Sequence, residues 1–377
     1  MTEKRRTAEI AGAGFAGLTL AAELARRGWR VRVHERAPEP RAFGAGIFLW
    51  ENGLRVLAEL GALDAVLADS HEAPHWQERD SDGALIGTRP LPLPGGLRMI
   101  TLTRQTLHTA LHEAARAHGA EIVAGSRVLG AHPDGALRTE DGWIHAADLV
   151  AGADGIRSAV RTALGLDGEH REFPVGLYRF LVPLDRAPGT DGQWRDYVNY
   201  WNTELSRRVL YVPCDSRHLY LLISAVDGDA ALRAPLDPRV WCESFPVLGP
   251  LLAHLPAHPR FDRYELIRPA RWSAGSAALI GDAAHAMPPT IGQGAGTAML
   301  NALDLARAVA DAADVPAALR AWETANRPAT ERTQDESLTA LRGLFPRTGE
   351  RRDEAWTEGT LSAARAVPSN GQQGEPG

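Results

Sequence analysis

Short apolar runs alternate with helical stretches over residues 7–70, a pattern that predicts βαβ units around a parallel sheet. Residues 74–97 are rich in Pro and Gly and indicate a loop or an edge excursion. Apolar positions at helical spacing predict a further helix over 104–118. The first part of the chain is therefore expected to be an α/β unit.

The pattern changes to short β-type runs between about 171 and 269, and Ala-rich helical sequence returns over 295–343. We expect an antiparallel sheet inserted into the first unit. The predicted division is a discontinuous α/β domain (1–73, 98–170 and 270–345), an inserted β-sheet domain (74–97 and 171–269) and a C-terminal tail (346–377). The tail is rich in Ser, Gly, Gln and Pro and is predicted to be partly disordered.

The sharpest motif is a G-x-G-x-x-G turn formed by Gly12, Gly14 and Gly17 between a predicted strand and a predicted helix. These glycines permit a tight turn, a close approach to a pyrophosphate and close helix–strand packing. The next β-run ends in Glu35, which can bind a ribose diol. Glycine turns also serve structural roles, and Glu35 alone could be a solvated loop acid, but the βαβ context favours a dinucleotide site.

Two later segments also end an apolar strand in an acid beside a glycine. The first contains Asp154 and Gly155, and the second contains Gly281 and Asp282. The second continues into Gly292–Gly296, which opens a predicted helix whose free N–H groups would accept negative charge.

Together, these three ordered motifs resemble the single-component FAD-dependent aromatic hydroxylases, the relatives of para-hydroxybenzoate and salicylate hydroxylases. The similarity covers roughly residues 7–345. The runs Arg41–Leu57, Tyr211–Cys214 and Ala321–Pro328 further resemble the 2-methyl-3-hydroxypyridine-5-carboxylic acid oxygenases, a branch that hydroxylates a pyridinol carboxylate and opens its ring.

The resemblance implies a Rossmann-type FAD-binding domain of the glutathione-reductase kind with an inserted antiparallel substrate domain. It also implies FAD as the cofactor, with NADH or NADPH as a transient co-substrate. The implied FAD-binding residues are Gly12, Gly14, Phe15, Ala16, Gly17, Glu35, Arg36, Arg41, Arg104, Asp154, Gly155, Gly281, Asp282, Gly292, Gly294 and Ala295.

The implied chemistry belongs to the cofactor: reduced flavin adds O2 at its C4a position, and the hydroperoxide transfers oxygen to an electron-rich aromatic ring. No side chain is assigned a certain catalytic role. Such chemistry needs a dry pocket with aromatic walls. Candidate wall residues are Phe48, Trp50, Trp76, Tyr200, Trp201, Tyr211 and Tyr220, although large aromatic residues in strands are usually core.

Arg179 and Arg208 each lie in an apolar β-run and need a partner. That partner is a substrate anion, or else a structural ion pair or solvent at a sheet edge. The resemblance favours the substrate for both arginines and for Tyr220. His285 is interpreted as packing beside the cofactor, with a proton relay as the alternative.

The chain departs from the pyridinol branch in its pocket. Phe48 and Trp76 replace tyrosines of that branch, and the sequence around Pro289 beside the flavin also differs. Because unpaired buried polar groups cost affinity, we expect a larger or less polar aromatic substrate. Simple hydroxylation is predicted ahead of ring opening.

Composition narrows the remaining classes of partner and of site. A formal charge of −6 is against nucleic-acid and anionic-membrane partners. Two distant cysteines offer neither a disulfide framework nor a metal cluster. With no apolar stretch near the ~20 residues of a membrane span, we expect a cytoplasmic monomer or homodimer that binds a small aromatic substrate and O2. The alternatives are a ring-opening oxygenase, a flavin dehydrogenase or reductase, and a non-catalytic FAD sensor.

Overall fold

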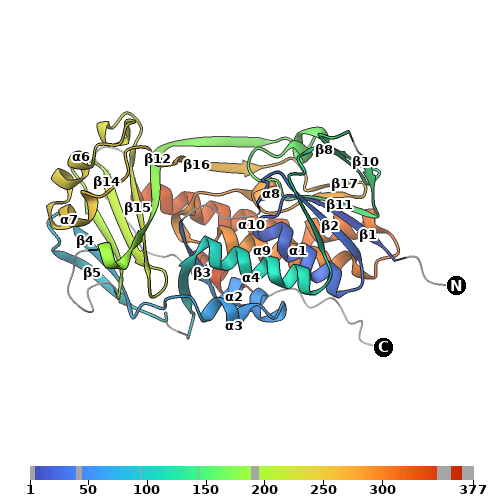
Figure 1. Cartoon of the computed structure of the whole chain (residues 1–377), viewed down its shortest axis with the longest axis horizontal. Helices are drawn as coiled ribbons and strands as arrows, with labels where there is room; N and C mark the ends of the chain where they lie inside the picture. The colour runs from blue at the N-terminus through green and yellow to red at the C-terminus, as the bar shows by residue number, and fades with distance from the viewer. Residues whose placement is uncertain are drawn as a thin grey trace.

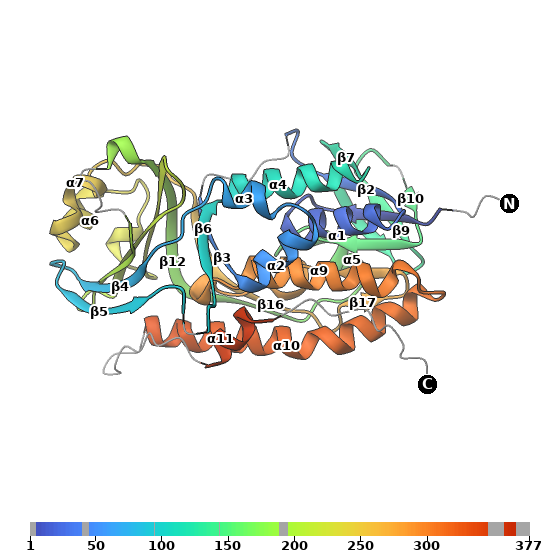
Figure 2. The same cartoon turned by 90° about the horizontal axis from the view of Figure 1, so that it is seen from below.

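The computed structural model describes residues 5–39, 45–93, 95–142, 144–187, 195–345 and 358–366. Two units lie side by side, and Figure 1 shows a sheet unit on the left and an α/β unit on the right. Helix α10 (Val315–Leu344) extends beneath both units in Figure 2. The chain thus places an α/β layer against one face of a separate β-sheet.

The α/β unit is built on a six-stranded sheet in the order β17-β18-β11-β1-β2-β7, parallel except for the β17–β18 pair. Its strands are β1 (Thr7–Ala11), β2 (Arg30–Glu35), β7 (Glu121–Ala124), β11 (Leu149–Gly152), β17 (Ser273–Ala274) and β18 (Ala277–Leu279). The central strand β1 is almost wholly buried, as parallel sheets covered on both faces require. The expected parallel α/β architecture is confirmed.

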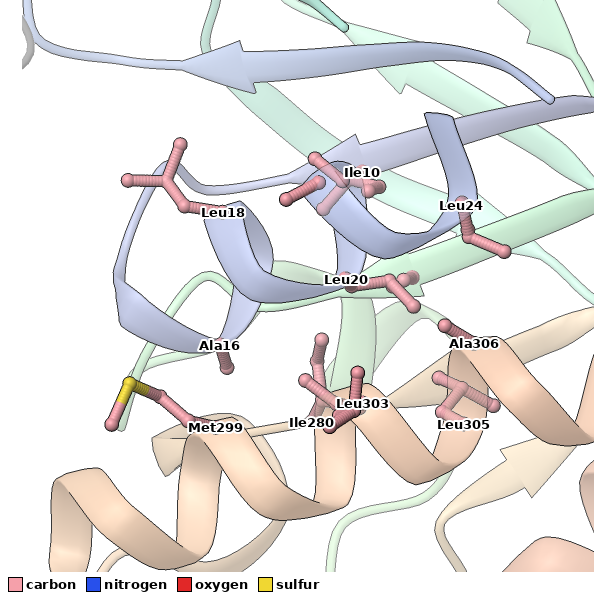
Figure 3. Packing of buried hydrophobic residues seen from close by; sticks show 14 of the residues in the cluster. Ile10, Ala16, Leu18, Leu20, Leu24, Ile280, Met299, Leu303, Leu305 and Ala306 are labelled. Carbon is pink, nitrogen blue, oxygen red and sulfur yellow. The ribbon is translucent and has the colours of Figure 1, made fainter. Parts of the chain in front are cut away.

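Helices α1 (Phe15–Arg26) and α9 (Gly294–Ala310) pack together on this sheet. Figure 3 shows Ala16 and Leu20 of α1 facing Met299 and Leu303 of α9. All four are buried, and each buried large apolar side chain contributes roughly 1.5–3 kcal/mol. This contact fixes the start of α1 relative to the start of α9, the two helix ends at which the site is built.

Further elements complete the α/β unit. The ribbon β3–β6 runs antiparallel at the boundary between the units. A three-stranded sheet β10-β9-β8 lies beside the main sheet. The elements are β3 (Gly46–Trp50), α2 (Glu51–Glu59), α3 (Leu63–Leu67), β6 (Met99–Thr103), α4 (Arg104–Ala117), β8 (Val128–His132), β9 (Ala136–Thr139), β10 (Ile144–Ala146), α5 (Ala159–Ala163), α8 (Asp282–His285) and α11 (Glu358–Ala364).

The second unit is a seven-stranded sheet in the order β16-β12-β15-β14-β13-β4-β5. All pairs are antiparallel except β13–β4, which joins residues 75–90 to strands more than a hundred residues later. The elements are β4 (His75–Asp80), β5 (Leu85–Pro90), β12 (Glu169–Pro183), β13 (Tyr197–Asn202), β14 (Arg207–Pro213), β15 (His218–Val226), α6 (Pro238–Ser244), α7 (Gly249–Leu252) and β16 (Phe261–Arg268).

This sheet has two different faces. Its outer face packs under α6 and α7, where Trp241, Phe245 and Leu252 are fully buried. Its inner face packs toward the ribbon β3–β6 and the end of α10, and includes Trp76, Tyr220 and Tyr264. Because strand side chains alternate between faces, register decides which residues reach the α/β unit.

Residues 358–366 of the expected tail form α11 and the turn after it, and Ala364 is fully buried against the inner-face cluster. Every helix in the described ranges is too short or too polar to span a bilayer. Cys214 and Cys242 are both free thiols.

Candidate active site

The glycine turn has the geometry that the motif predicts. Gly12 has a φ of +99°, and a Cβ there would lie 2.4 Å from the carbonyl oxygen of Ala153. A Cβ on Gly17 would lie 2.1 Å from the Gly12 carbonyl oxygen, whereas one on Gly14 would meet no atom within 4 Å. Helix α1 begins without a side-chain cap. Its first N–H groups and the open space at Gly14 therefore fit a pyrophosphate.

Glu35 closes the turn from the neighbouring strand. Its carboxylate accepts hydrogen bonds from the N–H of Ala13 (3.0 Å) and of Ala37 (2.9 Å). The acid is thus aimed at the glycine turn, where remaining lone pairs fit a ribose diol. Arg36 is exposed beside it, and Arg41 lies outside the described residues.

Asp154 and Gly155 border the same turn. The Cα of Asp154 lies 3.2 Å from a Cβ built on Gly12. The Asp154 carboxylate accepts hydrogen bonds from the Ser158 hydroxyl (2.5 Å) and the Val160 N–H (3.2 Å), so it organises the start of α5. The structure therefore shows a loop-ordering role for Asp154 next to the dinucleotide turn.

Arg104 and Asp282 approach each other from α4 and α8. The Arg104 guanidinium lies over the Phe15 ring, 4.8 Å from its centre, and burial together with nearby Arg179 lowers its pKa to about 10. The Asp282 side chain is exposed, but partial desolvation by the protein around its carboxyl raises the pKa of that group, while Arg104 and Arg179 act to lower it. An acid and a cation within electrostatic reach of each other fit the polar ribityl and phosphate part of FAD.

The start of α9 forms the end of the candidate FAD site opposite the glycine turn. Gly292 has a φ of +66°, and its Cβ would lie 3.2 Å from the Phe48 Cβ. Gly294 and Ala295 open α9 and are partly exposed, and no side chain caps the helix. The Gln293 side-chain nitrogen is buried without a hydrogen-bond partner, although its oxygen accepts from Asn52 (2.9 Å). Uncapped N–H groups and an orphaned amide donor fit the carbonyl-rich edge of a flavin ring.

These features agree with a family comparison. The chain matches the FAD binding domain family over residues 5–337. It belongs to that family. A 2-heptyl-3-hydroxy-4(1H)-quinolone synthase of Mycobacteroides abscessus is 42% identical to it over 88% of each chain. A 3-amino-4-hydroxybenzoate 2-monooxygenase of Streptomyces cremeus is 32% identical over 85% of this chain and 83% of its own.

Solved structures agree on the architecture. The tetrameric form of 2-methyl-3-hydroxypyridine-5-carboxylic acid oxygenase matches with a TM-score of 0.87 and 42% identity, over 96% of this chain and 97% of its own. The protein is therefore an FAD-dependent monooxygenase of the aromatic hydroxylase family. FAD is its cofactor, and a reduced nicotinamide is the transient co-substrate typical of the family.

In this monooxygenase the inner face of the seven-stranded sheet lies next to the candidate FAD site. Tyr220 packs against β3, since a Cβ on Gly46 would lie 2.5 Å from the Tyr220 Cβ. Burial raises the pKa of Tyr220 to about 12, with Arg179 acting to lower it. Arg104 lies within electrostatic reach of Tyr220, Arg179 and Asp282. The structure therefore brings four of the expected site residues near one another, namely Arg104, Arg179, Tyr220 and Asp282.

Among the expected wall residues, five share this boundary and two do not. The Phe48 and Trp76 rings lie 5.8 Å apart, and Pro289 is exposed beside the start of α9. Tyr200 and Tyr211 instead pack on the outer face, 5.9 Å apart under α6 and α7. The interpretation of Tyr200 and Tyr211 as pocket walls was wrong, because strand register turns them away from the flavin domain.

The two predicted substrate arginines have protein partners. Arg179 forms an ion pair with Asp262 across β12 and β16. Arg208 is buried, donates from Nε to the side-chain oxygen of Asn199 (2.7 Å) and lies over the Trp201 ring. Both remain on the inner face of the sheet, which packs toward the α/β unit.

Several inner-face residues were not singled out from sequence. They are Glu78, Asn199, Ser224 and Tyr264, and Gln293 was missed at the flavin end. Burial raises the pKa of Tyr264, and Arg208 and Arg179 act to lower it. Ser224 lies four residues after Tyr220 on the same strand, so side-chain alternation could have assigned it to the inner face. Glu78 could not be assigned in this way, because it reaches that face only through the pairing of β4 with β13.

His285 is a packed residue in the described structure. It is buried beside the Trp272 ring, 5.4 Å away, and its Nε2 lies 3.2 Å from the Asn301 amide nitrogen. Burial lowers its pKa to about 4. It is therefore neutral at physiological pH, and its contacts are those of a core residue.

Proposed function

We propose that this monooxygenase hydroxylates an uncharged bicyclic heteroaromatic ring of the 4-quinolone type, with NADH or NADPH as reductant. One observation carries the proposal: both inner-face arginines already have partners within the protein, Arg179 with Asp262 and Arg208 with Asn199. A pocket in which one arginine is ion-paired and the other is already hydrogen-bonded within the protein does not require a substrate carboxylate. The 42% identity to a quinolone synthase supports the same ring class.

The proposed pocket uses Phe48, Trp76, Tyr220 and Pro289 as walls, with Arg179 and Arg208 behind them. When bound and reduced, FAD would supply the chemistry that activates O2, from which one oxygen atom passes to the ring. The aromatic walls exclude water and hold the ring flat against the flavin end of α9. The Tyr220 hydroxyl stays protonated at neutral pH, because its pKa is raised, and donates a hydrogen bond to the ring oxygen of the substrate.

A hydroxypyridine carboxylate is the second candidate. It is favoured by the presence of two arginines on the inner face and by the match to 2-methyl-3-hydroxypyridine-5-carboxylic acid oxygenase. With that substrate the enzyme would open the ring, which adds two oxygen atoms to the product.

The test is NADH and NADPH oxidation with 2-heptyl-4(1H)-quinolone and with a hydroxypyridine carboxylate, each under isotopically labelled O2. One labelled oxygen in the quinolone, read by mass spectrometry, is the expected result. Turnover of the hydroxypyridine carboxylate alone, with two added oxygen atoms, would replace the proposal by ring opening. Oxidation of the nicotinamide with peroxide as the only product would reject both ring types.

A matched pair of variants assigns the face. Tyr220→Phe is expected to raise KM for the quinolone about tenfold through the lost hydrogen bond. Tyr211→Phe removes the same hydroxyl from the outer face and should leave KM unchanged. Equal effects of the two variants would contradict the assignment of Tyr220 to the pocket.

The proposal places the enzyme in the cytoplasm, where reduced nicotinamides are available, as a monomer or homodimer. The matching oxygenase has a tetrameric form, which is the competing assembly. Light scattering of the FAD-loaded protein distinguishes these masses.

A further inference from the structure

Glu78 is a buried acid on the inner face of the substrate sheet. Its side chain belongs to a residue only 8% exposed, and its carboxylate accepts three hydrogen bonds from uncharged donors. These come from Trp76 Nε1 (2.5 Å), Trp201 Nε1 (3.0 Å) and Asn199 Nδ2 (3.3 Å). A buried carboxylate is costly unless it is hydrogen-bonded and its charge is compensated.

The Asn199 amide links Glu78 to a positive charge, the Arg208 guanidinium. The Asn199 amide donates to Glu78 from its nitrogen and accepts from Arg208 Nε at its oxygen (2.7 Å). This amide orientation is the one that both partners require, because a carboxylate only accepts and a guanidinium only donates. Arg208 is 5% exposed and also lies over the Trp201 ring, which is itself bound to Glu78.

The same carboxylate fixes a wall of the pocket. Trp76 lies 5.8 Å from Phe48 and 6.3 Å from Tyr197, measured between ring centres. Its indole N–H points to Glu78, so the ring cannot turn without losing that hydrogen bond. One side chain therefore sets both the charge behind the pocket and the orientation of an aromatic wall.

We propose that Glu78 is a positioning and specificity-determining residue that holds Trp76 and balances Arg208 through Asn199, so that the pocket favours an uncharged ring over a carboxylate. This inference rests on the proposed function. The competing explanation is that Glu78 only fastens β4 to β13. Such a role would change stability, but it would not change the choice between a charged and an uncharged ligand.

The experiment uses a ligand pair with one ring system, 4-hydroxyquinoline and 4-hydroxyquinoline-2-carboxylate. Their dissociation constants are measured from the perturbation of the flavin spectrum in the FAD-loaded enzyme. Glu78→Gln removes the negative charge and should shift the ratio of the two constants about tenfold toward the carboxylate. Glu78→Asp keeps the charge but not the reach to Trp76, so it should weaken both ligands and preserve their ratio.

Two further variants make the test independent of one substitution. Arg208→Gln removes the opposite charge, and it should shift the ratio toward the uncharged ligand. Asp80→Asn removes a carboxylate two residues along β4 that binds the N–H groups of Asp82 and Ala84, and it should leave the ratio unchanged. Opposite shifts from Glu78→Gln and Arg208→Gln support the proposal even if one of them lowers FAD content.

An unchanged ratio in folded, FAD-loaded Glu78→Gln would overturn the role of Glu78. If the wild-type enzyme hydroxylates the quinolone, that result leaves the proposed function intact. If the wild type neither binds 4-hydroxyquinoline nor transfers labelled oxygen to the quinolone, the proposed function fails, and the inference fails with it.

Discussion

Single side chains at the FAD site differ in what they do before and after the cofactor binds. Gly12 is required by the backbone itself, whereas the open space at Gly14 serves only a ligand. The exposed Asp282 carboxylate has a raised pKa through partial desolvation, so its charge weakly disfavours the apoprotein. Substitutions can therefore separate folding from cofactor binding at neighbouring positions.

Gly12→Ala should destabilise the apoprotein by about 2 kcal/mol or more, since it combines a positive φ with a clash against Ala153. Gly14→Ala has an extended φ of −77° and free space, so it should leave apoprotein stability unchanged and weaken only FAD binding. Thermal unfolding with and without FAD measures both effects. A loss of apoprotein stability in Gly14→Ala would contradict the open pyrophosphate site.

Asp282→Asn should stabilise the apoprotein slightly at neutral pH, because the exposed carboxylate keeps much of its hydration. The folded-state pKa of Asp282 is raised, so its stabilising contribution is complete below the ordinary Asp pKa of about 3.9 and is lost as pH rises through the folded value. The gain of the variant should therefore shrink as the pH falls. FAD affinity should drop about tenfold or more, because a charged hydrogen bond is lost. Urea unfolding at several pH values measures the stability change, and titration with FAD measures the loss of affinity. A gain in stability that does not depend on pH would show that the charge of Asp282 is not its cause.

At the scale of elements, short helices and ribbons decide how the two units meet. Helix α11 contributes Ala364 to the inner-face cluster, and the Ala363 carbonyl accepts a hydrogen bond from Asn52 (3.3 Å). Asn52 also binds Gln293 at the start of α9. The last described helix is thus linked by one amide to the flavin end of the site.

Ala364→Asp should release α11, because burying an unpaired charge costs about 2 kcal/mol or more. Ser362→Asp places the same side chain at an exposed position of the helix and should have little effect. Hydrogen exchange of residues 358–366 reports the difference. Equal protection in the two variants would mean that α11 is not held by the burial of Ala364.

The elements also explain what sequence could predict. Gly12, Glu35 and Gly292 belong to local strand–turn–helix motifs, so their proximity follows from the order of elements. Glu78, Asn199 and Arg208 come from three strands whose contact depends on the parallel β4–β13 pairing. No local pattern encodes that pairing, and the wrong assignment of Tyr200 and Tyr211 has the same origin.

At the scale of the whole molecule, the two units share structure. Strand β12 pairs with β16 over Glu169–Glu172 and again over Gly176–Tyr178, and with β15 over Val175–Pro183. Figure 1 shows β12 and β16 running between the units. Helix α10 contacts both, with Trp322 in the α/β core and Phe345 just past its end beside Trp201.

The FAD-loaded enzyme should therefore unfold in one transition. Urea unfolding followed by flavin fluorescence and by tryptophan fluorescence should give coincident curves, and FAD at a hundred times its Kd should add about 2.7 kcal/mol to both. Trp241 reports the sheet unit, while Trp272 and Trp322 report the α/β unit. Release of flavin well before the tryptophan change would show that the units are not coupled.

The two-faced substrate sheet has a consequence for how new activities arise on this scaffold. The outer face carries an apolar core under α6 and α7, while the inner face carries a second buried cluster that packs toward the α/β unit and includes the proposed substrate residues. Leu210, Leu222 and Ser224 are buried on the inner face, so substitutions there should keep the side-chain volume close to the original to limit the loss of stability. Substrate range on this scaffold can therefore change through the alternate positions of the sheet strands that face inward. A directed-evolution library confined to those positions would test this consequence.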